Sequence, residues 1–415
     1  MGLLDPHGRR RPGHGGVPLT RRYRTLDDLD VRGKRVLVRL DLNVPLEDGE
    51  VGDDTRVRAS LGTVEELLEK GATLFLMSHL GRPKGGPDDA YRLGPVAERM
   101  AELLGREVRY LPTPGPGSAE QQAFVQEAPE GSVTLLENTR FDARETKNDP
   151  ELARVLASYA DLYVNDAFGS AHRAHASTEG VARLLPGAAG RLMLREVEAL
   201  SRLVDDPERP FVVVLGGAKV SDKLGVIESL LGKADRLLVG GAMAYTFVRA
   251  QGGEVGDSLV EEEMLGTARE LIEQAAAADV PLRLPEDSVC AREVEAGAER
   301  SVHPSDAVPA GLKGLDIGPA AREAFAAALR GAKTVFWNGP MGVFEVEGFE
   351  EGTLAVARAV AALEGAFTVV GGGDSVAAVN RAGVAGSIGH VSTGGGASLE
   401  FIENGDLPGL AVLRD

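Results

Sequence analysis

The sequence has a single cysteine, Cys290, among its 415 residues, so no internal disulfide can form. Such sparing use of cysteine is typical of a reducing compartment, and we expect a cytoplasmic protein in which Cys290 is a small buried hydrophobic residue. No apolar run is long enough to span a bilayer. The first 22 residues are rich in glycine, proline and arginine and lack the apolar segment of a signal peptide, so we expect a disordered extension there.

Positive charge is also scarce. The 45 lysines and arginines stand against 63 aspartates and glutamates, which gives a net charge of −18. Proteins that bind nucleic acid or a membrane surface through charge are usually basic, so we expect neither partner. Two common signatures of nucleotide binding are missing as well, because neither GxxxxGKS/T nor GxGxxG occurs. Any nucleotide site in this chain must therefore be built in another way.

What the sequence does contain is a regular alternation of apolar strand patterns and amphipathic helix patterns. The length and the 43% hydrophobic content are typical of two or three globular domains. Strands are expected in KRVLVRL, ATLFLM, SVTLL and ADLYV, and helices are expected over 55–70, 93–104 and 150–159. Such alternation predicts an α/β fold with parallel sheets.

Polar and basic side chains follow four of the expected strands. The carboxyl ends of parallel strands meet at one edge of a sheet, where ligands bind. In so acidic a chain, this repeated placement of cations predicts a pocket for a polyanion, although each histidine could equally be a local hydrogen-bond partner. The residues concerned are Asp41, Asn43, Arg56 at the start of the first helix, His79, Arg82, Arg140, His172 and Arg173.

A helix over 190–204 is expected to connect this first α/β run to a second one. The second run opens with PFVVVLGGAKVSDKLGVIESLL, in which a buried strand is followed by Gly216, Gly217 and a helix. Lys219 and Lys223, four residues apart, are expected in the first turns of that helix. Strand, glycine turn and helix together outline a phosphate site, and the alternative is two solvated lysines on a surface helix.

Other strand ends of the second run are rich in glycine, in LLVGGAMAYTF, TVFWNGPMG and TVVGGGDSVAAV. Exposed backbone N–H groups at such junctions suit phosphates and a flat purine. Glu345 could accept the hydroxyls of a ribose. Asp374 is either a helix N-cap or a metal ligand. His303 and His390 have no partners at metal-ligand spacing, so no zinc site is expected.

The two runs together describe a kinase. One offers arginine and histidine for a small anion, and the other offers glycine loops and lysines for a magnesium nucleotide. Phosphoryl transfer needs positioning and positive charge, which Lys219 and Arg56 are best placed to supply. No carboxylate stands out as a general base, as expected if the acceptor is already ionised. The alternatives are another carboxylate kinase, such as an amino-acid kinase, and a binding protein that closes on a phosphorylated metabolite without chemistry.

Eight motifs, in order and spread from Tyr23 onward, resemble those of the phosphoglycerate kinase family: RLDLNVP, SHLGRP, LLENTRF, GSAHRAH, LGGAKVSDK, FWNGPMGVFE, GGGDS and STGGGASLE. The resemblance implies a monomer with two Rossmann-like domains joined by a connecting helix with a hinge. It implies reversible transfer between 1,3-bisphosphoglycerate and MgADP, giving 3-phosphoglycerate and MgATP in glycolysis. The expected segments are 1–22 (extension), 23–189 (substrate domain), 190–205 (connecting helix), 206–392 (nucleotide domain) and 393–415 (return to the first domain).

The resemblance also implies roles for individual residues. Three would be catalytic, namely Arg56, Lys219 and Gly395. The substrate set is Asp41, Asn43, Arg56, His79, Leu80, Gly81, Arg82, Arg140, His172 and Arg173. The nucleotide set is Gly217, Lys219, Lys223, Gly241, Gly314, Asn338, Glu345, Gly372, Gly373, Asp374 and Ser375, with Asp374 contacting Mg²⁺. Leu42 and Thr139 depart from the family pattern, and we expect them to alter packing only.

Overall fold

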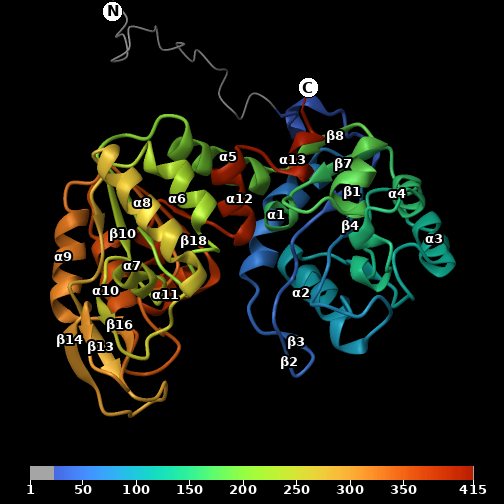
Figure 1. The fold of residues 1–415 in the computed structure, drawn as a ribbon. Helices are drawn as coiled ribbons and strands as arrows, with labels where there is room; N and C mark the ends of the chain where they lie inside the picture. Colours follow the sequence, from blue (N-terminus) through green and yellow to red (C-terminus); the bar gives the residue numbers. More distant parts are fainter. Residues whose placement is uncertain (1–22, 415) are drawn as a thin grey trace, which may run out of the picture. The chain divides into compact units, whose positions relative to one another are not determined.

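The fold is shown in Figure 1 as a computed structural model, which describes residues 23–414. The extension expected over 1–22 lies outside the described residues. The chain forms two compact units. The first comprises 23–166, 175–198 and 409–414, and the second comprises 167–174 and 199–408. The expected helix between the two α/β runs is confirmed as α5 (Arg191–Val204), and the boundary between the units falls within it.

The first unit is built on a six-stranded sheet in which every pair of neighbouring strands is parallel. Its strands are, in spatial order, β5 (Arg109–Tyr110), β6 (Val133–Leu135), β4 (Thr73–Met77), β1 (Arg35–Arg39), β7 (Leu162–Asn165) and β8 (Gly187–Ala189). All five residues of β4 are buried, as expected for a strand covered on both faces. A hairpin of β2 (Leu46–Glu47) and β3 (Glu50–Val51) follows β1.

Three helices of the first unit begin and end close to the predicted positions, namely α1 (Thr55–Glu69), α2 (Gly94–Leu104) and α4 (Pro150–Ala157). A further helix, α3 (Ala119–Gln126), was not predicted. Asp149 caps α4 by accepting the backbone N–H groups of Glu151 and Leu152, as its sequence predicts. Alternate residues of β1 and β4 pack with apolar residues of α1 and α2 in one core, which includes Val36, Val38, Leu74, Leu76, Val57, Val64 and Val96.

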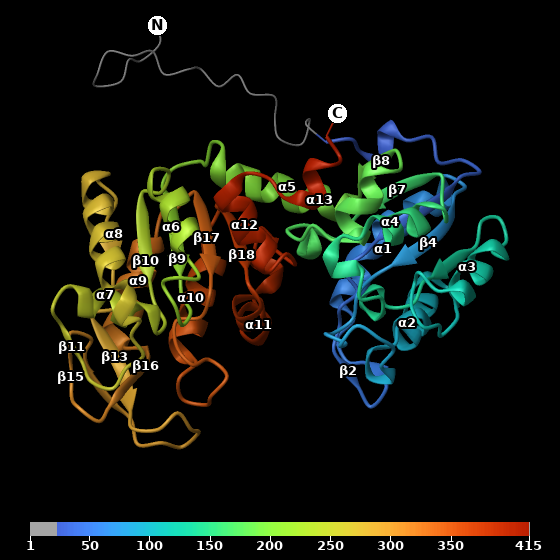
Figure 2. The same cartoon turned by 45° about the vertical axis from the view of Figure 1, so that its right-hand side comes forward.

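The second unit contains a parallel sheet with the doubly wound strand order 3-2-1-4-5-6. Its strands are β12 (Leu282–Arg283), β10 (Arg236–Val239), β9 (Phe211–Leu215), β17 (Thr334–Asn338), β18 (Phe367–Gly371) and β19 (His390–Val391). Figure 2 shows β10, β9, β17 and β18 side by side. The strand order reverses between β9 and β17, and such a reversal opens a crevice at the carboxyl ends of the strands.

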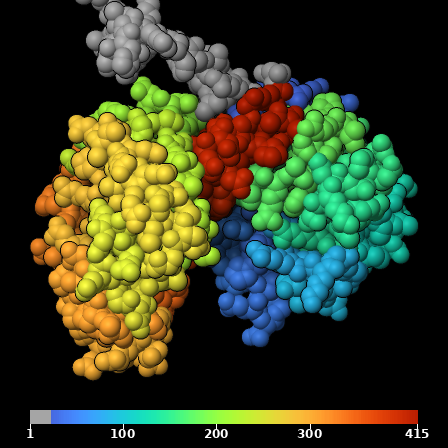
Figure 3. All heavy atoms as spheres, viewed as in Figure 1, coloured from blue at the N-terminus to red at the C-terminus, as the bar shows by residue number. Residues whose placement is uncertain are grey.

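Within 206–408, seven α-helices belong to this unit: α6 (Leu224–Leu231), α7 (Met243–Ala250), α8 (Leu265–Ala277), α9 (Pro319–Leu329), α10 (Glu351–Ala361), α11 (Gly373–Arg381) and α12 (Gly396–Asn404). The short helix α13 (Pro408–Ala411) lies at the boundary, because the first unit includes the chain from Gly409 onward. In Figure 3 the yellow part of the chain, which includes α8, covers much of the visible face of this unit. The core contains Val212, Val214, Phe325, Val335 and Trp337.

The expected segment 393–415 is divided between the two units. Residues 393–408 belong to the second unit because α12 packs against α6, where Ser229 Oγ donates to the carbonyl of Ile402 at 2.8 Å. Residues 409–414 belong to the first unit, in which Tyr23 and Arg414 form an isolated antiparallel bridge.

A small antiparallel sheet in the second unit was not predicted. It consists of β14 (Ser301–Pro304), β13 (Asp287–Ala291) and β16 (Lys313–Ile317), and a further pair joins β11 (Glu254–Val255) to β15 (Ala307–Val308). Cys290 lies in β13 and is fully buried, which confirms the expectation for it, and burial raises the pKa of its thiol to about 11. The predicted α/β class with parallel sheets is confirmed, and no helix in 23–414 combines the length and apolarity needed to cross a membrane.

Asp166 follows β7 and anchors the start of α5. Its side chain is fully buried, and Oδ1 accepts the backbone N–H of Met193 at 3.0 Å. Burial raises the pKa of Asp166 to about 7, although backbone hydrogen bonds from Met193 and Leu192 oppose the shift. The first turn of α5 therefore depends on a carboxyl group that is hard to ionise.

This raised pKa predicts a pH-dependent stability. Between roughly pH 4 and pH 7 the native protein binds more protons at Asp166 than the unfolded chain does, so its contribution to stability falls as the pH rises. Asp166→Asn keeps an oxygen acceptor for Met193 and removes the ionisation. Relative to the parent protein, we expect the free energy of unfolding of this variant to rise by roughly 2 kcal/mol from pH 5 to pH 8, as measured by urea titration. The exposed carboxylate control, Asp161→Asn, should show no such change, and parallel curves for Asp166→Asn would refute the coupling.

Candidate functional site

In the first unit, residues that follow three different strands and one that opens α1 meet at Gly81. Asn43 Oδ1 accepts the backbone N–H of Gly81 at 2.8 Å, and Arg140 Nη1 donates to the Gly81 carbonyl at 2.6 Å. Arg56, in the first turn of α1, donates from Nη1 to the Asn43 carbonyl at 2.9 Å and lies 3.4 Å from Asp41 Oδ1. The structure thus brings together five of the predicted residues at the carboxyl ends of β1, β4 and β6.

His79 belongs to the same edge and is held by a residue that the sequence analysis missed. Arg39, the last residue of β1, lies with Nη2 3.2 Å from His79 Nδ1. A guanidinium can only donate, so Nδ1 must accept and the imidazole proton must sit on Nε2. Arg39 therefore fixes both the orientation and the tautomer of His79.

Arg39 is itself part of a buried polar network. Its side chain is fully buried, and Nε donates to Ser177 Oγ at 2.9 Å. Ser177 in turn donates its hydroxyl to Glu145 Oε1 at 2.5 Å and its backbone N–H to Glu145 Oε2 at 3.0 Å. Burial raises the pKa of Glu145, against the effect of the Arg39 charge. A buried arginine loses its contacts with water and needs hydrogen-bond partners in the protein. Ser177 and Glu145 provide the hydrogen bond and the negative charge that offset the burial of Arg39 next to His79.

The remaining residues of the predicted substrate set are less closely tied to Gly81. The backbone of Leu80 is clamped by Asn138, which accepts its N–H at 3.2 Å and donates to its carbonyl at 2.8 Å. Arg82 is exposed. His172 and Arg173 lie on 167–174, which belongs to the second unit, and Arg173 Nε lies 3.1 Å from His172 Nε2.

In the second unit, the predicted start of the lysine-bearing helix is wrong. α6 begins at Leu224, so Lys223 is its N-cap residue and Lys219 lies exposed in the preceding loop. The reason is Glu261, whose carboxylate accepts the backbone N–H groups of Val220 and Ser221 and the Ser221 hydroxyl. These contacts hold Val220 and Ser221 in a turn that precedes the helix.

Three loops approach one another at the reversal point of the second sheet. Gly217 donates its N–H to the Pro340 carbonyl at 3.1 Å, and Gly241 donates to the Met341 carbonyl at 3.0 Å. A Cβ atom at Gly216 would lie 2.1 Å from the Pro340 oxygen, and one at Gly241, where φ is +68°, would lie 2.6 Å from the Gly217 nitrogen. Only glycine fits these two positions, because backbone occupies the space of a side chain.

Lys223 is held over the same edge by Asn338, at the end of β17. Lys223 Nζ donates to Asn338 Oδ1, and Asn338 Nδ2 donates to the Gly371 carbonyl at 2.8 Å. Ser375 Oγ accepts the N–H of Gly339 at 2.7 Å. Burial lowers the pKa of Lys223, whereas the charges of Asp222 and Asp374 raise it. Asn338 thus connects Lys223 to Gly371, and Ser375 connects the start of α11 to Gly339.

Asp374 is not the N-cap of its helix. The N-cap position of α11 is Gly372, and Asp374 lies in the first helical turn, close enough to Lys223 to influence its pKa. The capping role is therefore wrong, and the alternative of a metal contact stays a prediction. Gly395 is the N-cap residue of α12, so the glycine turn does precede a helix as expected.

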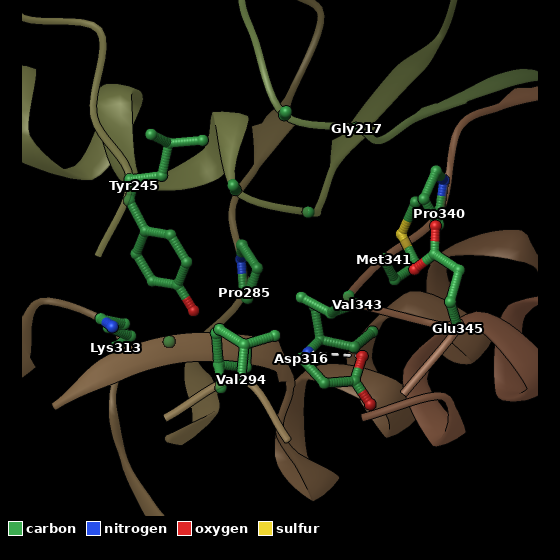
Figure 4. A pocket seen from close by; sticks show the side chains of 18 of the residues that line it. Gly217, Tyr245, Pro285, Val294, Lys313, Asp316, Pro340, Met341, Val343 and Glu345 are labelled. Carbon is green, nitrogen blue, oxygen red and sulfur yellow. Dashed lines mark hydrogen bonds between the residues drawn. The ribbon is translucent and has the colours of Figure 1, made fainter. Parts of the chain in front are cut away.

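A cavity of about 500 Å³ opens at these loops. Figure 4 shows Glu345 and Tyr245 on opposite sides of it, with Met341 beside Glu345 and Asp316 between the two sides. Five of the predicted nucleotide residues line it, namely Gly217, Gly241, Gly314, Glu345 and Asp374. Such a volume and an apolar lining with few polar groups are typical of a small-molecule site.

Asp316 lines this cavity and is, after Arg39, the second residue that the sequence analysis missed. It is buried at the end of β16, where it accepts the N–H of Ile317 at 2.9 Å and that of Gly352, near the start of α10, at 2.7 Å. Burial raises its pKa to about 7, although these hydrogen bonds and Arg322 oppose the shift. The available signal was a lone aspartate within the apolar residues of GLDI, just as Arg39 was a lone arginine in VLVRL.

Comparison with known proteins gives a consistent result. The family model described as phosphoglycerate kinase matches residues 26–405. A phosphoglycerate kinase of Thermus thermophilus is 64% identical over 391 residues, which cover 94% of this chain and 100% of that protein. One of Deinococcus radiodurans is 53% identical over 412 residues, covering 99% of this chain and 98% of the relative.

Comparison with solved structures points to the same family. The phosphoglycerate kinase of Coxiella burnetii superimposes with a TM-score of 0.84 at 40% identity, covering 94% of this chain and 98% of that one. The enzyme of Pyrococcus horikoshii gives a TM-score of 0.81 at 34% identity with the same coverage. Both parallel sheets and the motifs at their edges are thus accounted for by one set of relatives, and the chain belongs to the phosphoglycerate kinase family of carboxyl-group phosphotransferases.

Proposed function

We propose that the first unit binds 3-phosphoglycerate or 1,3-bisphosphoglycerate, that the second binds MgADP or MgATP, and that the protein transfers the phosphoryl group reversibly between them. One observation carries this division. The strand ends of the first unit present arginines and a histidine, whereas those of the second present glycine backbone around a cavity of about 500 Å³. The first suits a small polyanion and the second suits a nucleotide.

In the first unit, positive charge and fixed donors hold the substrate. Arg56, Arg82 and Arg140 would pair with its carboxyl and phosphate groups, since guanidinium groups match such oxygens in two-point contacts. His79, held by Arg39, would donate from Nε2. Asp41 and Asn43 would contact the glycerate part, and Leu80 and Gly81 would contribute backbone. His172 and Arg173 are included on the resemblance of their motif alone.

In the second unit, the phosphates would lie over the loops at Gly217, Gly241 and 372–375. The nucleoside would contact Gly314 and Glu345. Lys219, which lies exposed in its loop, would contact the transferring phosphoryl group, whereas Lys223 is fixed by Asn338. Gly395, at the N-terminus of α12, would offer backbone N–H to the same group.

A magnesium ion fits this donor set. Mg²⁺ is usually bound by one or two carboxylates together with substrate phosphates rather than by a protein cage. Asp374 supplies such a carboxylate near Lys223, and within 23–414 there is no cluster of three or more acidic, histidine or cysteine side chains suited to a metal. When bound, the ion would neutralise charge on the nucleotide phosphates.

The acceptor explains why the site contains no obvious general base. A carboxylate is ionised at neutral pH, so no proton has to be removed before it attacks. Arg56 and Lys219 then have one task each, which is to neutralise charge that builds up on the phosphoryl oxygens. We propose that the protein acts as a monomer in the cytoplasm, in keeping with its family and its single cysteine.

The activity is tested by incubating the protein with 3-phosphoglycerate and MgATP and following NADH oxidation through glyceraldehyde-3-phosphate dehydrogenase. Turnover with 3-phosphoglycerate, and none with aspartate or glutamate as acceptors, is the expected result. Binding of both ligands without turnover would instead identify a binding protein, and turnover with an amino acid would identify another kinase.

Arg56→Ala should lower kcat by about 10³-fold or more, because an arginine that stabilises the transition state can be worth that much. The KM for MgATP should change little, since Arg56 belongs to the other unit. Arg58→Ala is a matched control from the same helix, because Arg58 is exposed and pairs with Asp54 at 2.8 Å. A variant at position 56 with near-parental kcat would remove this arginine from the mechanism.

Lys219→Ala should abolish turnover while 3-phosphoglycerate still binds with unchanged affinity, as measured by titration calorimetry. The expectation follows from the position of Lys219 in the second unit. The exposed Lys333, replaced by alanine, controls for loss of one surface cation. Loss of 3-phosphoglycerate binding in Lys219→Ala would show that the assignment of ligands to units is wrong.

The two units should approach each other when both ligands are present, because neither unit carries both sets of charged groups. Small-angle X-ray scattering should then give a smaller radius of gyration with 3-phosphoglycerate and a non-hydrolysable MgATP analogue together than with either alone. An unchanged radius with both ligands would argue against transfer by closure.

A further inference from the structure

The loop that carries Lys219 connects β9 to α6, and both Ala218 and Lys219 are exposed in it. Its first part is nevertheless tied to the rest of the second unit. Gly217 donates its N–H to the Pro340 carbonyl at 3.1 Å, and its own carbonyl accepts the N–H of Met243, the first residue of α7, at 3.0 Å. The backbone is therefore fixed two residues before Lys219.

On the other side of Lys219 the loop is held by a side chain, that of Glu261. Its Oε2 accepts the backbone N–H of Val220 at 2.5 Å and that of Ser221 at 3.2 Å, and its Oε1 accepts the Ser221 hydroxyl at 2.5 Å. Val220 is also fully buried. The two residues that follow Lys219 thus share one carboxylate, and the backbone there cannot move away without breaking these hydrogen bonds.

Glu261 is itself fixed, because the segment on which it lies packs against α7. Its side chain is 8% exposed, and its backbone N–H donates to Thr246 Oγ1 of α7 at 3.1 Å. The preceding residue, Val260, packs against the apolar cluster that contains Tyr245 and Val248 of the same helix. One helix therefore supports both sides of the loop, directly on the first side and through Glu261 on the second.

The burial of this carboxylate indicates what it is for. A buried carboxylate costs free energy unless hydrogen bonds replace those that it makes with water. The donors described above come from two consecutive residues of one loop, so the contacts that offset the burial of Glu261 also fix that loop. If Glu261 served the fold alone, its loss would lower stability and leave the chemistry of the folded protein unchanged.

We propose that Glu261 is a positioning residue for phosphoryl transfer, because it fixes the backbone from which Lys219 reaches the transferring phosphoryl group. The inference rests on the role proposed above for Lys219. A lysine has a long, flexible stem, so the position of its ammonium group is defined only if its backbone is. A loop that is already ordered does not have to be ordered again in the transition state. MgADP lacks the transferring group, so its affinity should not depend on Glu261.

The kinetic test uses Glu261→Ala and Glu261→Gln. In Glu261→Ala, kcat with 3-phosphoglycerate and MgATP should fall by roughly 10- to 100-fold, because a displacement of about 1 Å can cost that much. The KM for 3-phosphoglycerate and the calorimetric Kd for MgADP should stay within about twofold of the parental values. Glu261→Gln keeps an oxygen acceptor for Val220 and should recover most of the lost kcat. Parental kcat in a folded Glu261→Ala protein, or a loss of MgADP affinity as large as the loss of kcat, would overturn the proposal.

A second measurement does not depend on turnover. Amide hydrogen exchange of Val220 and Ser221, followed in the ligand-free protein, should be at least about tenfold faster in Glu261→Ala than in the parent, since hydrogen bonds to a charged group contribute about that much. Exchange at Met243 should not change. Equal exchange at Val220 and Ser221 in parent and variant would show that Glu261 does not hold the loop. Should Glu261→Ala fail to fold, Ser221→Ala removes the hydroxyl contact alone, and parental exchange and kcat in that variant would count against the proposal.

Glu262→Ala is the matched control, because it removes the same charge from the adjacent, exposed position. It should keep the parental kcat and the parental exchange at Val220 and Ser221. The two measurements separate this proposal from the activity on which it rests. Absence of turnover in the parent would contradict the proposed function, whereas faster exchange in Glu261→Ala with an unchanged kcat would contradict the positioning role of Glu261 alone.

Discussion

The close approach of three backbone loops at the reversal point of the second sheet is the constraint on which the cavity depends. The loops after β9, β10 and β17 hydrogen-bond one another directly, with Gly217 to Pro340 at 3.1 Å and Gly241 to Met341 at 3.0 Å. No side chain fits between them, because a Cβ at Gly216 would meet the Pro340 oxygen. Backbone atoms therefore form this surface of the cavity, and charged side chains can only be supplied by residues around it.

The two units place their cations in opposite ways. In the first, charge is built into the sheet, since Arg39 is fully buried and needs Ser177 and Glu145 to satisfy it. Buried charges seldom add stability, so such a network is better explained by what it orients, which is His79. In the second, the half-buried cation is Lys223, whose pKa is lowered by burial and whose amino group donates to Asn338. Lys219, by contrast, is exposed in the loop that precedes α6.

Sequence patterns predicted those parts of the fold that depend on burial and on local backbone chemistry. Five-residue apolar runs such as β9 are covered on both faces, and Asp149 caps its helix as its position before Pro150 indicates. The antiparallel strand β13 was missed because DSVCA has neither a long apolar run nor clear alternation. The start of α6 was misplaced because Glu261, about forty residues away along the chain, satisfies the loop N–H groups, and no local pattern can reveal such a partner.

In the candidate site, too, sequence patterns located some residues and missed others. Motifs name the side chains that would touch ligands, since those lie on strand ends that a pattern can locate. The groups that hold them are found only in three dimensions. Arg39 reaches His79 across 40 positions, and Tyr245 reaches Ser288 across 43. Orientation and proton placement at the candidate site therefore depend on partners that are distant in the sequence.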